Sequence, residues 1–140
     1  MIRATKDYNE QIRSLLLDNW DMVSDDGSTE DFSIDYDTMI ILYSPGFMSM
    51  FVPMNHTMAD AHICSNLKGS TELAYDSFDY LVRKTSIRNL IASIPVYNKK
   101  CIAFAEKIGF EKIGINKSSF LKDGKLTDTI LYTRRLSCHQ

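Results

Sequence analysis

The stretch SIPVYNKKCIAFAEKIGF, from Ser93 to Phe110, decides how the chain is organised. It continues an apolar segment, Asn89 to Val96, that has the length and composition of a buried strand. Asn98 follows, and its side chain can accept a hydrogen bond from the first turn of a helix. The apolar residues after it recur at helical spacing: Cys101, Ile102, Ala105 and Ile108. Gly109 suits the left-handed residue that ends many helices, so the stretch predicts a strand, a helix and a new strand from Phe110.

This order resembles the C-terminal half of the GNAT superfamily of acyl-CoA N-acyltransferases. In the family pattern an Asn opens the helix, a small residue follows three positions later, and Leu or Ile before Gly-Phe closes it. The matching residues here are Asn98, Cys101, Ile108, Gly109 and Phe110. The segment FEKIGINKSSFLKDGKLTDTILYTRRL, residues 110–136, is similar to the closing hairpin of the family. One position departs: where the family usually has a tyrosine that protonates the leaving CoA thiolate, this chain has Ala105.

The rest of the chain alternates strand and helix patterns. Strands are expected at residues 2–4, 38–43, 47–53 and 58–64, and helices are expected from Asp7, as N-cap, to about Met22 and after the loop 65–71. The order is strand, helix, three strands, helix, strand, helix, two strands. It predicts an α/β (α+β) fold, in which a mixed, mostly antiparallel central sheet carries helices on both faces, as one GNAT-like domain over residues 1–140.

Residues 24–37, SDDGSTEDFSIDYD, interrupt this pattern with a polar, acidic segment. It predicts a loop with one short helical turn around residues 30–34. Two interpretations stay open: a solvated connector between elements, or a wall on the acceptor side of a substrate site.

Composition excludes several classes of protein. The chain is 44% hydrophobic and 24% charged, which is typical of a globular protein. It has no apolar run near the roughly 20 residues of a membrane span, and its first segment is polar. A cytoplasmic protein without membrane contact is therefore expected. The cysteines are odd in number and widely spaced, which predicts reduced thiols, with the first two in the core and the last on a loose tail: Cys64, Cys101 and Cys138. The histidines do not cluster with them, so no metal site is expected: His56, His62 and His139.

Charge is divided unevenly along the chain. Residues 1–67 carry three basic and eleven acidic residues, a net charge of −8, while residues 68–140 carry thirteen basic and seven acidic residues, a net charge of +6. This asymmetry indicates an anionic partner for the second half and a cationic one for the first, unless folding intermixes the two surfaces. Aromatic residues are sparse around the basic segment LVRKTSIRN, residues 81–89, so nucleic acid is not an expected partner.

The loop NLKGST, Asn66 to Thr71, has the form of a Gly-containing turn that enters a helix and holds a phosphate by its backbone. The resemblance places Asn66, Gly69 and Thr71 at the Arg or Gln, the first glycine and the second glycine of the loop that wraps the pyrophosphate of acetyl-CoA. Lys68 and the hydroxyls of Ser70 and Thr71 could also contact phosphate, whereas the Cβ of Thr71 would crowd it. The alternative is a vestigial loop with ordinary N-cap chemistry.

The resemblance further implies that strands 58–64 and 89–96 are a parallel pair that splays apart around the pantetheine arm. His62, Ile63 and Cys64 would then line the thioester end, and Asn98 would either contact the ligand or only cap its helix. Asp60 and His62 share a face of one strand, so either could be the base that deprotonates an amine, or both could be ordinary surface residues. With Ala105 at the tyrosine position, the alternative proton donors are Tyr97, Ser118 and Ser119.

Two functions from different classes follow from the resemblance. The first is an N-acetyltransferase that moves the acetyl group of acetyl-CoA to an amine of a small molecule or protein, with a cationic acceptor favoured by the acidic first half. The second is a catalytically eroded bacteriophage accessory protein of the virion or its head assembly, which uses the fold as a binding module in the host cytoplasm or the virion. A homodimer through an edge strand is compatible with either.

Overall fold

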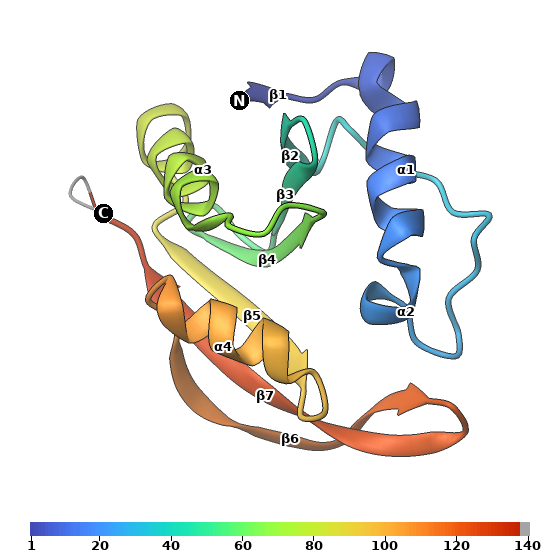
Figure 1. The fold of residues 1–140 in the computed structure, drawn as a ribbon. Helices are drawn as coiled ribbons and strands as arrows, with labels where there is room; N and C mark the ends of the chain where they lie inside the picture. The colour runs from blue at the N-terminus through green and yellow to red at the C-terminus, as the bar shows by residue number, and fades with distance from the viewer. Residues whose placement is uncertain (138–140) are drawn as a thin grey trace.

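Seven strands form one mixed sheet in the order β1-β2-β3-β4-β5-β7-β6 in the computed structural model, which describes residues 1–137 (Figure 1). The strands are β1 (Ile2–Arg3), β2 (Ile40–Ser44), β3 (Phe47–Pro53), β4 (Met58–Ser65), β5 (Asn89–Pro95), β6 (Glu111–Lys122) and β7 (Lys125–Arg135). All neighbours are antiparallel except β4 and β5. The expected mixed, mostly antiparallel sheet is confirmed.

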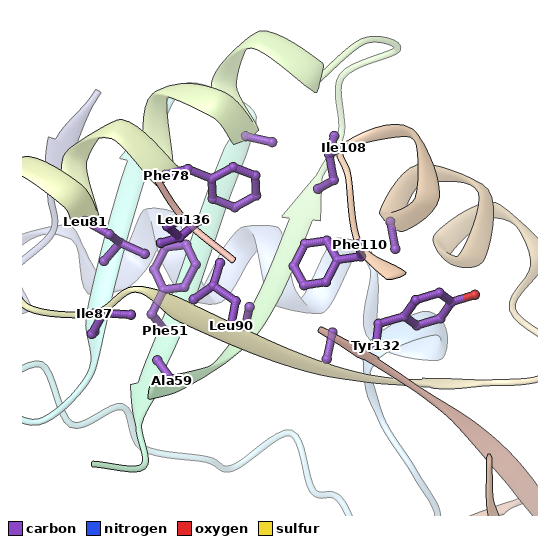
Figure 2. Packing of buried hydrophobic residues seen from close by; sticks show 14 of the residues in the cluster. Phe51, Ala59, Phe78, Leu81, Ile87, Leu90, Ile108, Phe110, Tyr132 and Leu136 are labelled. Atoms are coloured by element: carbon purple, nitrogen blue, oxygen red, sulfur yellow. The ribbon is translucent and has the colours of Figure 1, made fainter. Parts of the chain in front are cut away.

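Helices cover both faces of this sheet. They are α1 (Asn9–Asp18), α2 (Trp20–Val23), α3 (Thr71–Lys84) and α4 (Lys99–Lys107), preceded by a short 3-10 turn at Lys6–Tyr8. The sheet residues packed with α3 and α4 form the larger core, which includes Phe51, Phe78, Leu81, Leu90 and Tyr132 (Figure 2). A second core packs α1 on the opposite face and includes Ile12, Leu15, Ile41, Met48 and Cys64. Alternation along each strand divides its side chains between these two cores.

The parallel strands β4 and β5 pair only at their beginning. Three residue pairs join them, from Met58 with Asn89 to Asp60 with Ile91. Beyond these pairs β4 stays on β3 as far as Ser65, and β5 stays on β7 as far as Pro95. The predicted divergence is therefore confirmed, and it divides the sheet into two halves.

The segment that organises the sequence folds as its pattern predicts. The Oδ1 atom of Asn98 accepts a hydrogen bond from the backbone N–H of Cys101 at 3.2 Å and caps α4. Gly109 follows the helix at φ 95°, a conformation that glycine adopts without strain, and Phe110 is buried just before β6. Two bounds differ by one residue, since β5 stops at Pro95 instead of Val96 and β6 begins at Glu111 instead of Phe110.

The first helix departs from prediction at both ends. Asp7 is not its cap; instead the hydroxyl of Thr5 accepts from the backbone N–H of Asp7 within the 3-10 turn. The single helix expected to reach Met22 divides at Asn19, whose side chain donates to the carbonyl of Leu15. Local bonds of this kind compete with regular helical bonding, which explains the break.

The acidic segment contains no helical turn at residues 30–34, contrary to prediction. A turn lies at residues 36–38, because the carboxylate of Asp35 accepts the backbone N–H groups of Asp37 and Thr38. The following strand therefore begins at Ile40 instead of Thr38.

Within residues 1–137, no helix is long and apolar enough to span a membrane. Across the same residues no group of His, Cys, Asp and Glu side chains could hold a metal ion. Cys64 and Cys101 are free thiols, while Cys138 and His139 lie outside the described residues.

Candidate active site

A cavity of about 380 Å³ occupies the opening between β4 and β5. One set of its wall residues belongs to the core under α3 and α4: Ala61, Ile63, Ala92, Ile94, Cys101, Phe104, Ala105, Ile108 and Phe110. Others pack against α1 in the second core, among them Leu16, Met48, Met50 and Cys64. Because its walls come from both cores, the cavity passes through the sheet where β4 has left β5.

The loop between β4 and α3 is held by its own side chains. The hydroxyls of Ser65 and Ser70 lie 2.7 Å apart, and the Ser65 hydroxyl accepts from the N–H of Leu67. The amide of Asn66 donates to the carboxylate of Asp18 at 2.9 Å and accepts from the side chain of Asn19. The Asn66 side chain therefore faces the end of α1 and is already bonded there.

The N-terminus of α3 presents unused hydrogen-bond donors. Ser70 is its N-cap residue, yet the Ser70 hydroxyl makes no bond to the first turn. As a result, the N–H groups of Thr71, Glu72 and Leu73 have no acceptor among residues 1–137. A helix of 14 residues carries partial positive charge at this end, which suits a phosphate.

The surroundings of this helix end are open. Lys68 is exposed and is the one cation of the loop, while the exposed Glu72 opposes an anion from the first turn. A Cβ atom placed at Gly69 would meet no atom within 4 Å. Loop and helix end therefore leave room for a ligand beside Gly69.

His62 and Asp60 form a hydrogen-bonded pair on one face of β4. The Nε2 atom of His62 lies 2.9 Å from a carboxylate oxygen of Asp60, and the side chains are 57% and 37% exposed. His62 lines the cavity, and Asp60 does not. If Nε2 donates its hydrogen to Asp60, Nδ1 is left as a proton acceptor, so the pair is organised as a base and the carboxylate that orients it.

Helix α4 supplies one wall of the cavity, through Asn98, Cys101 and Ala105 among others. Asn98 caps the helix and also borders the cavity, so both of its expected roles are geometrically open. Ala105 is 6% exposed and brings no hydroxyl group to the wall. Burial raises the pKa of the Cys101 thiol, which therefore stays protonated at neutral pH.

Cys64 borders the cavity from β4. Its sulfur donates to the carbonyl of Leu15 at 3.4 Å, and burial raises the pKa of the Cys64 thiol to about 11. This thiol is a small core residue, as the sequence predicted, and a poor nucleophile.

The three alternative proton donors are not among the residues that line the cavity. The Ser119 hydroxyl bonds the carbonyl of Asn116 and the hydroxyl of Thr129, both at 2.7 Å. Ser118 is exposed, and Tyr97, 44% exposed, packs beside Phe120 with ring centroids 6.3 Å apart. Their role as proton donors stays a prediction.

Sequence reasoning missed three aromatic side chains of the cavity, which come from segments far apart in the chain: Trp20, Phe32 and Phe120. Phe32 carried a usable signal, because it is the one phenylalanine in the mostly polar segment 24–37. The loop therefore contributes Phe32 to the cavity lining, and its role as a wall on the acceptor side stays a prediction.

A sequence profile of the family described as "Acetyltransferase (GNAT) domain" matches residues 61–131, half of the chain. The chain belongs to this family of GNAT acetyltransferase domains. No match was found among curated protein sequences.

Solved structures share the fold. A spermidine N-acetyltransferase from Vibrio cholerae, in complex with CoA and spermine, aligns with a TM-score of 0.77 at 15% identity over 96% of this chain and 94% of that one. A ribosomal-protein-alanine N-acetyltransferase from Brucella melitensis aligns with a TM-score of 0.72 at 16% identity over 96% and 98% of the two chains. Neither comparison bears on a bacteriophage origin.

Proposed function

We propose that this protein transfers the acetyl group of acetyl-CoA to a primary amine. The observation that carries the proposal is the cavity between the diverging strands β4 and β5. Its walls come from both faces of the sheet, so two substrates can approach its centre from opposite sides. On the face covered by α3 and α4, unused N–H groups can receive a diphosphate. On the face covered by α1, the His62–Asp60 pair can receive the amine.

Each substrate has a place in this arrangement. The diphosphate of acetyl-CoA binds at Gly69 and at the N–H groups of Thr71 to Leu73, with Lys68 beside it. The pantetheine arm follows the edge of β4 from Ala61 to Ser65, where β5 no longer supplies hydrogen-bond partners. The thioester then lies at the level of His62 and Ile63, between the two faces of the sheet.

The reaction needs a neutral amine. His62, oriented by Asp60, accepts a proton from the ammonium form directly or through water. The nitrogen lone pair then forms a bond to the thioester carbonyl carbon, the carbon–sulfur bond breaks, and the thiolate leaves with its electron pair. A free thiol has a pKa of about 8.5, so the thiolate can take its proton from solvent. Cys101 is a poor donor for this step, because burial raises the pKa of its thiol.

The binding test is a thermal shift with acetyl-CoA. Ligand at 100 times its dissociation constant adds about 2.7 kcal/mol of stability. At an unfolding entropy of about 2.1 cal/mol/K per residue, this shift is roughly 9 °C for 140 residues. Release of free thiol with a panel of amines then measures transfer.

Two variants of Gly69 locate the anion site. The position is open, so both Gly69→Asp and Gly69→Asn should fold. Asp places a negative charge beside the diphosphate, and we expect it to weaken acetyl-CoA binding by more than about fivefold relative to the equally large Asn. Equal binding by the two variants would place the diphosphate elsewhere.

The bacteriophage binding module is the second candidate, and it rests on the departures from the family pattern at Asn66, Thr71 and Ala105. No thermal shift at millimolar acetyl-CoA would favour it over the enzyme. We also propose one domain over residues 1–140, a cytoplasmic location, and a homodimer along edge strand β6. The exposed Ile113 and Ile115 on β6 support such a dimer.

A further inference from the structure

We infer that the acceptor is a small apolar or aromatic primary amine that carries a single positive charge, and not a polyamine. The inference rests on the proposed function and concerns the half of the cavity that lies under α1 and α2. It is drawn from what lines that half and from where the acidic side chains of the first 67 residues lie.

The acceptor half of the cavity is apolar and aromatic. Its walls include Trp20, Val23, Phe32, Met50 and Phe120. The rings of Trp20 and Phe32 are stacked, with centroids 5.6 Å apart and planes 10° from parallel. In the part of the chain that the structure describes, no Asp, Glu, Lys or Arg lines the cavity. His62 is the one histidine among the described residues that line the cavity.

Three acidic residues of α1, α2 and the loop that follows are exposed or bonded outside the cavity. The side chain of Asp21 is 99% exposed, and the carboxylate of Asp18 accepts from Asn66. The carboxylate of Asp26 accepts the backbone N–H groups of Asp123 and Gly124 at 2.8 Å each, and these bonds lower its pKa. None of these three carboxylates lines the cavity, and Asp60, which is bonded to the lining residue His62, does not line it either.

The wall is anchored at both ends, so its lining is a fixed part of the fold. Arg13 donates to the carbonyls of Phe32 and Glu30 at 2.6 and 2.8 Å, and its guanidinium lies 4.3 Å from the centre of the Phe32 ring. At the other end, Lys122 donates to the carbonyls of Asp21 and Ser24 at 2.8 and 2.9 Å. These bonds join the segment after α1 to the tip of the β6–β7 hairpin.

This lining selects by charge. The reacting ammonium loses its charge when His62 takes its proton, so an apolar wall around it is tolerable. A second ammonium on the same molecule would enter the wall without a carboxylate partner, and an unpaired charge out of water is strongly disfavoured. A volume of about 380 Å³, shared with the thioester, also lies at the small end of the range for ligand pockets.

A matched pair of amines tests the inference. Pentylamine and 1,4-diaminobutane have the same length and differ by a methyl group in place of the second ammonium. We expect pentylamine to exceed 1,4-diaminobutane in kcat/KM by more than about tenfold, with 2-phenylethylamine at least as good as pentylamine. Equal or better turnover of 1,4-diaminobutane or spermidine would overturn the inference.

Binding can be measured without turnover, because Trp20 is the only tryptophan of the chain. In the presence of CoA, 2-phenylethylamine should change Trp20 fluorescence and saturate at a concentration more than about tenfold below that of 1,4-diaminobutane. The absence of saturation with both monoamines would overturn the inference. Loss of the acetyl-CoA thermal shift would instead refute the proposed function, so the two failures are distinguishable.

A carboxylate placed in the wall should change the preference. Val23 is 42% exposed at the rim of the cavity, so Val23→Glu and its neutral control Val23→Gln should both fold. Relative to Val23→Gln, the Val23→Glu variant should move the kcat/KM ratio towards 1,4-diaminobutane by at least about threefold. An unchanged ratio would place the bound amine away from this wall and would overturn the inference.

Discussion

Asn98 offers the sharpest test, because it caps α4 and also borders the cavity. We predict that its contribution is the cap alone. In Asn98→Ala the backbone N–H of Cys101 loses its acceptor, whereas Asn98→Ser keeps a side-chain oxygen at the N-cap and removes the carboxamide group that could contact a ligand.

The expected size of the effect follows from the cap and the length of the chain. Loss of an N-cap costs about 1 kcal/mol, within a range of about 0.5–2 kcal/mol. The unfolding entropy of 140 residues is about 0.3 kcal/mol per kelvin near the midpoint. Asn98→Ala should therefore lower Tm by about 3 °C, within a range of about 2–7 °C.

Differential scanning calorimetry and the KM for acetyl-CoA together decide the matter. If Asn98 acts only as a cap, Asn98→Ser recovers the Tm and keeps KM within about twofold of the wild-type value. A recovered Tm with KM raised more than about tenfold would show that the carboxamide contacts the ligand. A Tm unchanged in Asn98→Ala would refute the capping argument itself.

Three further predictions concern buried groups. The hydroxyls of Ser49 and Ser77, both 0% exposed, lie 2.7 Å apart, so Ser77→Ala should destabilise by about 1–3 kcal/mol in urea denaturation. The double variant with Ser49→Ala should cost less than the sum of the two single changes, and simple additivity would contradict the bond. At pH 8 an alkylating reagent should modify Cys64 about a hundredfold more slowly than an ordinary thiol, since the pKa of Cys64 is about 11 instead of 9.0. Peptide mass spectrometry with a denatured control measures the modification rate, and equal rates in the folded and denatured protein would contradict the raised pKa. The pKa of Tyr132 is raised to about 12 by burial and by Glu106, so its contribution to stability is complete below pH 10 and is lost between pH 10 and 12. Tyr132→Phe should flatten that alkaline fall in the free energy of unfolding, and an unchanged slope would contradict the assignment.

The parts of the fold that the sequence predicted are those fixed by local chemistry. The cap at Asn98, the glycine at Gly109 and the apolar spacing between them act within one turn of chain, so pattern and structure agree there. The departures at Asn19 and Asp35 have the opposite cause. In each, a side chain bonds nearby backbone and overrides a regular pattern that periodicity alone favoured.

The candidate site was harder to predict, because its residues meet only through tertiary structure. His62 and Asp60 could be paired from strand alternation, since both lie on β4. Phe120 approaches Trp20 and Phe32 because the tip of the β6–β7 hairpin binds the segment after α1. Lys122 donates to the carbonyl of Asp21, and Asp26 accepts the backbone N–H of Asp123. No periodicity in the sequence encodes those bonds.

The absence of a tyrosine at Ala105 carries less weight against catalysis than the family pattern implies. A thiolate with a conjugate pKa of about 8.5 is already a good leaving group, whereas an alkyl ammonium has a pKa near that of lysine, about 10.4, and cannot attack until it loses a proton. The larger energetic demand therefore falls on deprotonation of the amine, and the His62–Asp60 pair lies on the side of the cavity where that amine would enter. His62→Gln should then lower kcat/KM by about 10²–10⁴-fold near neutral pH and make the remaining rate rise with pH, as free amine accumulates in solution. A loss below about threefold with an unchanged pH profile would show that the amine is deprotonated elsewhere.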